Sequence, residues 1–255
     1  MTHPTFSHVS LPPSVQNDMM NAGVWTGHCP VPINRLSLVQ FSYHDFSDTI
    51  HYDGSLVVLD VLAPHVENIF RHLFLQRFPL QSAKRIEHFD GSDDASMEAN
   101  NSSAFNYRPI AGTNVISIHS YGAAIDVNPV QNPCLCHPKI IPEKGHSVVE
   151  VWPGEGTGYL NRGNQRPGMV EPLVKLFAEN GFRDWGGSWD DIVDYHHFQL
   201  HRSLAELLVS MKKDHADVLF KAYVADEKRI PITDTLAKDY AKDPESFMAK
   251  YDLLT

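Results

Sequence analysis

The chain has 255 residues and a net charge of −10, and these properties exclude several classes of protein. Hydrophobic residues make up 42% and charged residues 20%, which are ordinary values for a globular protein. The acidic balance argues against a nucleic-acid partner, because phosphate binding needs clustered Lys and Arg. No run of about eighteen apolar residues is present, so we expect no membrane span. The N-terminus lacks the basic and apolar regions of a secretory signal, so we expect synthesis in the cytoplasm without a signal peptide.

Periodic apolar positions predict the first elements of the chain. Residues 1–20 are polar and contain three prolines, a composition typical of an extended arm. Alternating side chains over 36–43 and an apolar run over 56–59 predict a β-hairpin, with a turn signal at Asp53-Gly54. Apolar residues at helical spacing over 66–74 then predict a helix.

The middle of the chain combines short strands with a long loop. Residues 115–118 predict a strand that ends at His119. Residues 127–165 are rich in Pro, Gly and Asn, so we expect a loop, and a loop of this length in a compact domain is usually functional. A helix over 170–177 and a strand that carries His197 follow.

The last fifty residues have a helical pattern. Apolar residues share one helical face after Ser203, and Asp243-Pro244 is typical of a helix start. We therefore divide the chain into an extended arm (1–20), a domain (21–205) and a helical C-terminal extension (206–255). The extension carries no recognisable chemistry, so it could complete the domain, form a dimer contact, or bind a secretion or inhibitor partner.

Two separated segments contain the residues of a metal site. His119 and Asp126 would lie roughly 23 Å apart on an extended chain, so the chain must turn back at Gly122 for both to bind one ion. Asp126 lies between Ile and Val, where a carboxylate is costly to bury unless it pairs or binds a cation. His197 could supply the third ligand, which leaves the open fourth position of a catalytic zinc site.

Further polar residues could complete the chemistry. Asp194 precedes His197 by three residues and is a candidate general base for hydrolysis. Strand alternation places His196 and His197 on opposite faces, so we expect only one of them to point into the site. Arg108 could stabilise charge on a carbonyl oxygen, or it could be a structural ion-pair partner. Alone, the Asp-x-x-His spacing is more often a surface pair than a site, and His119 could be a hydrogen-bonded loop histidine.

The three cysteines do not make a disulfide framework. Cys134, Cys136 and His137 form a C-x-C-H run, which is a weak zinc signature without a second half. We expect a loop with free thiols there.

The two segments together resemble the M15 family of zinc peptidases. Residues 117–126 read Ser-x-His-x-Tyr-Gly-x-Ala-x-Asp, residues 185–189 read Trp-Gly-Gly-Ser-Trp, and residues 194–199 read Asp-x-x-His-Phe-Gln. Residues 101–108 are similar to the subgroup with VanY-like domains. The resemblance covers roughly residues 22–205, and the family includes D-Ala-D-Ala peptidases and L-alanyl-D-glutamate endopeptidases.

This resemblance implies a role for five residues. His119, Asp126 and His197 match the zinc ligands, Asp194 matches the catalytic acid/base, and Arg108 matches the substrate-facing arginine. The implied fold is the α+β D-Ala-D-Ala peptidase/hedgehog-like fold, with a small antiparallel sheet flanked by helices. The predicted order of strands and helices is consistent with it.

The resemblance also predicts a function. We expect a zinc-dependent peptidase that cuts peptidoglycan stem peptides, foremost an endolysin-like L-Ala-D-Glu endopeptidase that acts in cell-wall lysis or remodelling. A D-Ala-D-Ala carboxypeptidase is the alternative, and a non-catalytic zinc-binding module is a further one. The wall lies outside the cytoplasmic membrane, so the protein would act there after release or delivery by a non-Sec route. Gln199 stands where the family usually has Glu, which we expect to tune zinc binding rather than abolish it.

Overall fold

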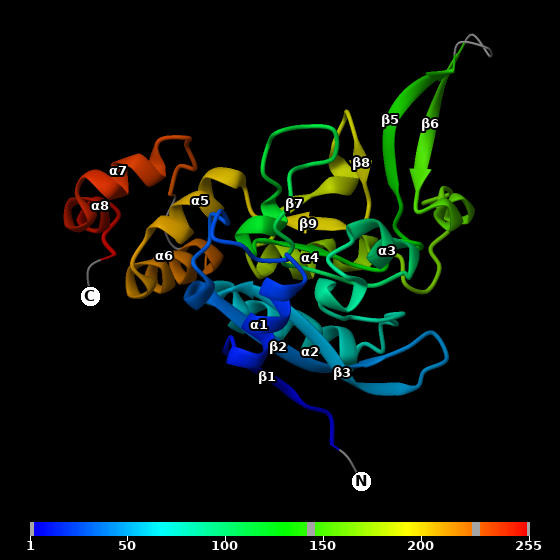
Figure 1. The fold of residues 1–255 in the computed structure, drawn as a ribbon, viewed down its shortest axis with the longest axis horizontal. Coiled ribbons are helices and arrows are strands. Elements are labelled where there is room, and N and C mark those ends of the chain that lie inside the picture. The colour runs from blue at the N-terminus through cyan, green and yellow to red at the C-terminus, as the bar shows by residue number, and fades with distance from the viewer. Residues whose placement is uncertain (1–2, 142–145, 226–229, 254–255) are drawn as a thin grey trace.

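The computed structural model describes residues 3–141, 146–225 and 230–253, and it shows a mixed fold of helices and small antiparallel sheets (Figure 1). The predicted α+β class is confirmed. The strands of the described residues form three separate three-stranded sheets rather than one, in the orders β1-β2-β3, β4-β9-β7 and β6-β5-β8.

The first sheet is built on the predicted hairpin. Strands β2 (Leu36–His44) and β3 (Ile50–Leu59) pair antiparallel, and β1 (Phe6–Ser10) covers the other edge of β2. All of β2 except Gln40 is buried, as expected for a central strand with both faces covered. Helix α2 (Ala63–Leu75) packs on β2 through its buried apolar stripe.

The predicted extended arm is partly wrong. The described part of residues 1–20 contains β1 and most of helix α1 (Pro13–Asn21), because its apolar side chains find partners in the core. Met19 is fully buried, and the ring of Phe6 packs edge-on against Phe74 at 5.5 Å. The division of the chain into three parts stays a prediction, and residues 1–2 lie outside the described residues.

The second and third sheets hold the candidate site. Strands β4 (Ala124–Asp126), β9 (His197–Gln199) and β7 (Asp184–Trp185) form a short antiparallel sheet, and helix α4 (Val174–Glu179) packs against it through Phe177, which stacks on Phe198. The third sheet contains β5 (Cys134–Ile141), β6 (His146–Trp152) and β8 (Val193–Asp194). Within the predicted loop over 127–165, the structure instead has the paired strands β5 and β6, which project from the body of the molecule (Figure 1), while residues 142–145 lie outside the described residues.

Helices dominate the C-terminal part, as predicted. The described helices there are α5 (Arg202–Ser210), α6 (Lys213–Ala225), α7 (Leu236–Lys242) and α8 (Pro244–Lys250). Asp243 caps α8, and its carboxylate accepts a hydrogen bond from the backbone N–H of Ser246 at 3.1 Å. Residues 226–229 and 254–255 lie outside the described part of the predicted extension. Among the described residues no helix is both long and apolar enough to cross a membrane.

Candidate metal centre

His119 lies on a turn rather than at the end of a strand. The predicted strand over 115–118 is wrong, because a 3-10 helix spans Ile118–Tyr121 and carries the histidine. The Ser117 hydroxyl accepts a hydrogen bond from the backbone N–H of His119, which caps this helix. Gly122 ends it with a φ of 63°, and a Cβ there would meet the backbone nitrogen of Leu59 at 2.5 Å. The turn back towards Asp126 therefore requires glycine.

The pairing of β4 with β9 places the other two ligand candidates opposite each other. Asp126 faces His197 in the antiparallel register, and Ile125 faces Phe198. Phe198 is fully buried and stacks on Phe177 with ring centroids 4.0 Å apart. A slip of one residue would exchange His197 for Phe198 at this position, so the aromatic core holds the register of the site.

The side chains of three residues converge on one point, and each of these residues was predicted as a ligand. Nε2 of His119 lies 3.1 Å from Oδ2 of Asp126, Nδ1 of His197 lies 3.0 Å from Oδ1, and the two nitrogens are 3.3 Å apart. Tetrahedral zinc with ligands near 2.0–2.1 Å separates its ligand atoms by about 3.3 Å. All three residues are buried, and together they can hold a metal ion.

In each of the two ligand histidines, one ring nitrogen donates a hydrogen bond away from the site, which leaves the other nitrogen free to bind a metal. His119 donates from Nδ1 to the carbonyl oxygen of Ala104 at 2.5 Å, which leaves the lone pair on Nε2. His197 donates from Nε2 to Oε1 of Gln199 at 2.9 Å, which leaves the lone pair on Nδ1. Three electron-rich atoms then face one another in a dry site. Such a set of ligand atoms fits a cation. The two acceptors, the carbonyl oxygen of Ala104 and Oε1 of Gln199, hold the imidazole rings in the orientation that binding requires.

The side chain of Gln199 bridges His197 and the carboxylate of Asp184. Its Nε2 donates to Oδ2 of Asp184 at 2.7 Å, while Trp189 donates from Nε1 to Oδ1 of the same carboxylate at 2.7 Å. A glutamate at position 199 would place a second carboxylate against Asp184. The amide can accept from His197 and donate to Asp184 at the same time, which gives a physical reason for glutamine at this position.

The charges of the ligand group depend on one another. Burial favours the neutral form of Asp126, but positive charge on His119 and His196 and hydrogen bonds from His119 and His197 lower its pKa well below the usual range. Burial also opposes a charge on His197, yet the hydrogen bond and charge of Asp126 raise its pKa. The carboxylate of Asp126 therefore stays ionised in spite of its burial.

Asp194 lies on the rim of the ligand group, on the two-residue strand β8. The short 3-10 helix Gly186–Ser188 packs directly against it, and a Cβ on Gly186 would collide with the backbone oxygen of Asp194. Gly186 therefore permits the close approach of two backbones beside Asp194, whereas Gly187 leaves room for the ring of Trp185. Sequence reasoning missed this role, although the paired glycines before Trp189 were the available signal.

His196 connects Asp194 to the ligands. The prediction that only one of the two adjacent histidines faces the site is wrong, since Nε2 of His196 lies 3.0 Å from Oδ1 of Asp194 and 3.9 Å from Oδ1 of Asp126. The chain enters β9 only at His197, so strict alternation does not apply to His196. Burial disfavours its charged form, but the charges of Asp194 and Asp126 raise its pKa to about 10. The imidazole is a cation between two carboxylates at neutral pH.

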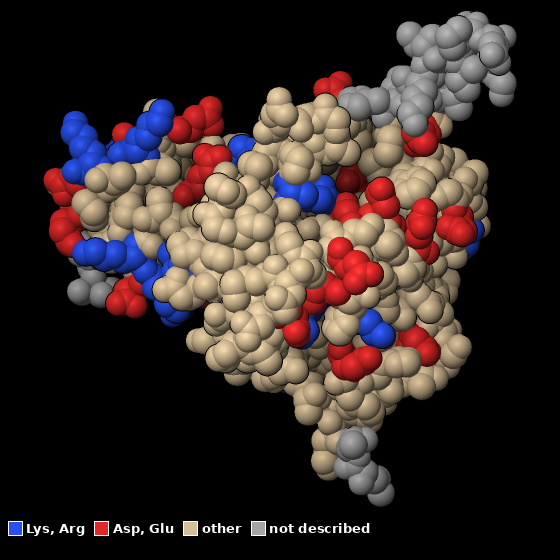
Figure 2. All heavy atoms as spheres, in the orientation of Figure 1, with Lys and Arg blue, Asp and Glu red and all other residues tan. Residues whose placement is uncertain are grey.

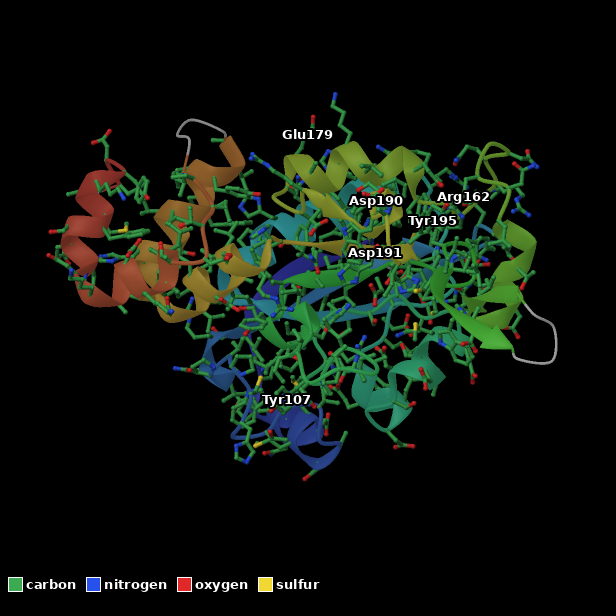
Figure 3. All side chains as sticks on the ribbon, turned by 90° about the horizontal axis from the view of Figure 1, so that it is seen from above. Tyr107, Arg162, Glu179, Asp190, Asp191 and Tyr195 are labelled. Atoms are coloured by element: carbon green, nitrogen blue, oxygen red, sulfur yellow. The ribbon has the colours of Figure 1, made fainter. Side chains whose placement is uncertain are left out.

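A second layer of contacts holds His196. Its Nδ1 donates to the backbone carbonyl of Asn132 at 2.8 Å. Arg162 bonds the Asn132 side chain at 2.8 Å and stacks over the ring of Tyr195, 4.3 Å from its centroid. Figure 3 labels Arg162 and Tyr195, which lie near each other on one side of the molecule. The loop before β5 thus anchors the residues next to His196.

Comparison with known families agrees with this geometry. Residues 111–200 match the model of a family of M15 peptidases described as D-alanyl-D-alanine carboxypeptidase. Over this segment the chain is similar to M15 peptidases. Neither the curated proteins nor the solved structures give a match to the chain.

The M15 segment contains all three ligand candidates and Asp194, whereas Arg108 lies just before it. The backbone N–H of Arg108 donates to the hydroxyl of Ser120, next to His119, at 3.0 Å. Its guanidinium pairs with Asp93 of helix α3 (Asp93–Glu98) at 2.6 Å, and its Nε is buried without a hydrogen-bond partner among the described residues. Figure 2 shows acidic side chains gathered over the region of α3. The Asp93 contact fits the structural ion-pair alternative, so a catalytic role for Arg108 stays a prediction.

The C-x-C-H run does not form a loop. Cys134 and Cys136 lie on β5 as free cysteines, as predicted for their thiols, and the side chain of His137 lies outside the described residues. Among the described residues, only the group of His119, Asp126 and His197 meets the geometry of a metal site, and it includes neither thiol.

Proposed function

We propose that this protein is a zinc-dependent peptidase that hydrolyses peptide bonds in the stem peptides of peptidoglycan. The observation that carries the proposal is the convergence of His119 Nε2, Asp126 and His197 Nδ1 at zinc-like separations, with Asp194 held beside them through His196. The family match to M15 peptidases supports the reaction class.

His119, Asp126 and His197 would hold the metal, and three protein ligands leave a position open for substrate or water. The chemistry that zinc supplies in such a site is polarisation of a carbonyl oxygen and a lowered pKa of water. The carboxylate of Asp194 accepts a proton from the attacking water and passes it to the leaving amine. The charged imidazole of His196 orients this carboxylate and offsets its charge when it is ionised.

The scissile bond is the finer part of the proposal. The description of the matched family favours a D-Ala-D-Ala carboxypeptidase. The L-Ala-D-Glu endopeptidase expected from the sequence is the second candidate, because the ligand set and Asp194 are equally suited to either bond. Substrate shape, and not the metal chemistry, distinguishes the two.

Digestion of purified muropeptides with analysis by mass spectrometry tests the proposal. We expect hydrolysis that disappears with a chelator and returns with zinc. Release of free D-Ala identifies the carboxypeptidase, while separation of the stem at L-Ala identifies the endopeptidase. Zinc binding without cleavage of any stem peptide would instead support the non-catalytic module.

The site of action follows from the substrate. Peptidoglycan lies outside the cytoplasmic membrane, so the protein would reach it after release from the cell or by delivery through a dedicated machine. The C-terminal helices α5–α8 offer a surface for such a partner. Comparison of delivery with and without residues 206–255 tests that role.

A further inference from the structure

Two cysteines lie next to the candidate base. Cys134 and Cys136 alternate along β5 and therefore point to the same face, where their sulfur atoms are 3.4 Å apart. Across the ladder, Cys134 is the direct partner of Asp194 in β8, and the next pair joins Leu135 to Val193. These two pairs are the whole β5–β8 register, so the backbone at Cys134 directly supports the backbone of Asp194.

The two thiols have different reactivities. The hydrogen bond with Cys134 lowers the pKa of Cys136 to about 7, against burial and the charges of Asp194 and Glu150, so a large fraction is thiolate near neutral pH. The same hydrogen bond and burial raise the pKa of Cys134, so it stays protonated. Both side chains are partly exposed. The pair therefore consists of a nucleophilic thiolate and an adjacent thiol that can resolve it.

Cys29 is the internal contrast. Burial raises its pKa to about 11, and its sulfur lies 3.5 Å from the backbone carbonyl of Ser120. A protonated thiol of this kind does not begin the reaction with peroxide, because the thiolate is the attacking species, and Cys29 has no hydrogen bond to a second thiol among the described residues. It serves as a built-in control for any reaction of the pair.

Closing a bond between the two sulfurs would move the backbone. Residues two apart on a strand have Cα atoms about 6.6 Å apart, close to the upper limit of about 6.8 Å for a disulfide. The sulfurs must approach from 3.4 Å to about 2.05 Å, and the usual disulfide span of about 5.5–6 Å between Cα atoms favours contraction of the strand between Cys134 and Cys136. Because Cys134 pairs with Asp194, that contraction pulls on β8.

We propose that Cys134 and Cys136 form a redox-active dithiol that closes to a disulfide and thereby displaces Asp194. With a peroxide as oxidant, the Cys136 thiolate attacks one oxygen and the O–O bond breaks, giving a sulfenic acid and, after protonation, water. The Cys134 sulfur then attacks the sulfenic sulfur, the S–O bond breaks, and a second water leaves with the Cys134 proton. Two thiols are oxidised and one peroxide is reduced. Only the effect on hydrolysis depends on the proposed function.

The test treats the full-length zinc-loaded protein with hydrogen peroxide and then with dithiothreitol. We expect accessible thiols in denaturant to fall from three to one, with the mass of two hydrogen atoms lost and the new bond mapped to the peptide containing 134 and 136. Stem-peptide hydrolysis should fall by at least about tenfold, since a positioned acid/base contributes roughly 10²–10⁴. Dithiothreitol should reverse both changes.

Matched variants separate the steps. Cys29→Ser should behave as the unmodified protein, whereas Cys136→Ser should form no intramolecular bond. Hydrogen exchange of the peptide spanning 193–199 should rise on oxidation in the unmodified protein and not in Cys136→Ser. Oxidation confined to sulfinic acid, or a disulfide that includes Cys29, would overturn the dithiol.

A mapped 134–136 disulfide with unchanged exchange at 193–199 would overturn the displacement. Failure of the proposed function gives a different result. A protein without hydrolysis in either redox state would still show the mass and exchange changes if the dithiol is present.

Discussion

The fold holds the three candidate ligands more firmly than it holds Asp194, the candidate acid/base. The ligands lie on β4, β9 and the 3-10 turn before them, and the aromatic core beneath holds the register of the two strands. Asp194 lies on β8, a strand of two residues at the edge of another sheet, and its side chain is partly exposed. The candidate ligands Asp126 and His197 therefore belong to one sheet and the candidate acid/base Asp194 to another, and His196 contacts both carboxylates.

This difference shows which part of the chemistry is adjustable. A metal ion tolerates little displacement of its ligands, so a fixed strand register suits them. A proton carrier can be engaged or withdrawn by a small movement, and a short edge strand permits that movement. We call His119, Asp126 and His197 the ligand wall, and Asp194 with strand β8 the other wall. We expect substitutions in the ligand wall to weaken metal binding, and substitutions in β8 to lower only the rate of turnover.

The largest effect should come from Asp126→Asn. The substitution keeps the shape of the side chain but removes the charge that pairs with His119, His196 and His197. We expect zinc affinity to fall by more than the roughly 10- to 100-fold typical for loss of a supporting hydrogen bond, and hydrolysis to be abolished. Isothermal titration with zinc measures the affinity. Retention of full zinc affinity would remove Asp126 from the ligand set.

Asp194→Asn should remove the candidate acid/base and leave the three candidate ligands unchanged. Zinc content should stay near that of the unmodified protein, because Asp194 is not among the three convergent residues. The kcat should fall by roughly 10²–10⁴, the range of general acid/base catalysis. Metal analysis and stem-peptide kinetics on the same preparation provide the check. A similar loss of zinc in this variant would contradict the separation of the two walls.

Gln199 tests the contacts behind the ligand wall. Gln199→Leu removes the acceptor that orients His197, so zinc affinity should fall roughly 10- to 100-fold. Gln199→Glu restores an acceptor but places it against Asp184, so we expect it to unfold at a lower temperature than the unmodified protein. Zinc titration and thermal unfolding distinguish the two outcomes. Equal behaviour of both variants would show that the link to Asp184 has no influence.

Gly186→Ala is a gentler change on the β8 side. The new methyl group would meet the backbone of Asp194, so β8 must shift by a small distance. We expect kcat to fall by about tenfold with zinc affinity unchanged, because a misplaced acid/base loses part of its 10²–10⁴ contribution. Ser188→Ala, in the same short helix, is the matched control. An unchanged kcat for Gly186→Ala would show that β8 tolerates displacement.

The smallest effect lies outside both walls. Burial and the charge of Lys221 lower the pKa of His65, whose ring packs edge-on against Phe220 of α6 at 5.0 Å. The unfolded chain binds this proton at higher pH than the folded chain, so stability is present above about pH 6.5 and is lost as the pH falls towards the folded pKa. His65→Gln should flatten this acid dependence in urea unfolding and leave hydrolysis at neutral pH unchanged. A steeper dependence would reverse the assigned direction.

The residues that meet at the candidate metal centre could be predicted from the sequence better than the architecture around them. The spacings around Gly122 and between Asp194 and His197 identified the ligand candidates and the candidate base, because metal sites demand particular residue types. The strand before His119 was wrong because the Ser117 cap and Gly122 override the apolar run. The β5–β6 hairpin was missed because Pro and Gly obscure its alternation. His196 was misplaced because tertiary contacts, not strand periodicity, orient it.

The pairing of Asp126 with His197 has a consequence for how such a protein can diversify. The chain leaves the centre after Asp126 and returns at His197, so the intervening segment forms one closed insertion. Doubling the length of a flexible loop costs only about 0.6 kcal/mol in closure entropy. Within this insertion, strands β5 and β6 project from the body of the molecule (Figure 1), so the length of the insertion can change with little thermodynamic penalty. The residues that would bind the metal can therefore be retained during evolution while the projecting hairpin changes and recognises other molecules.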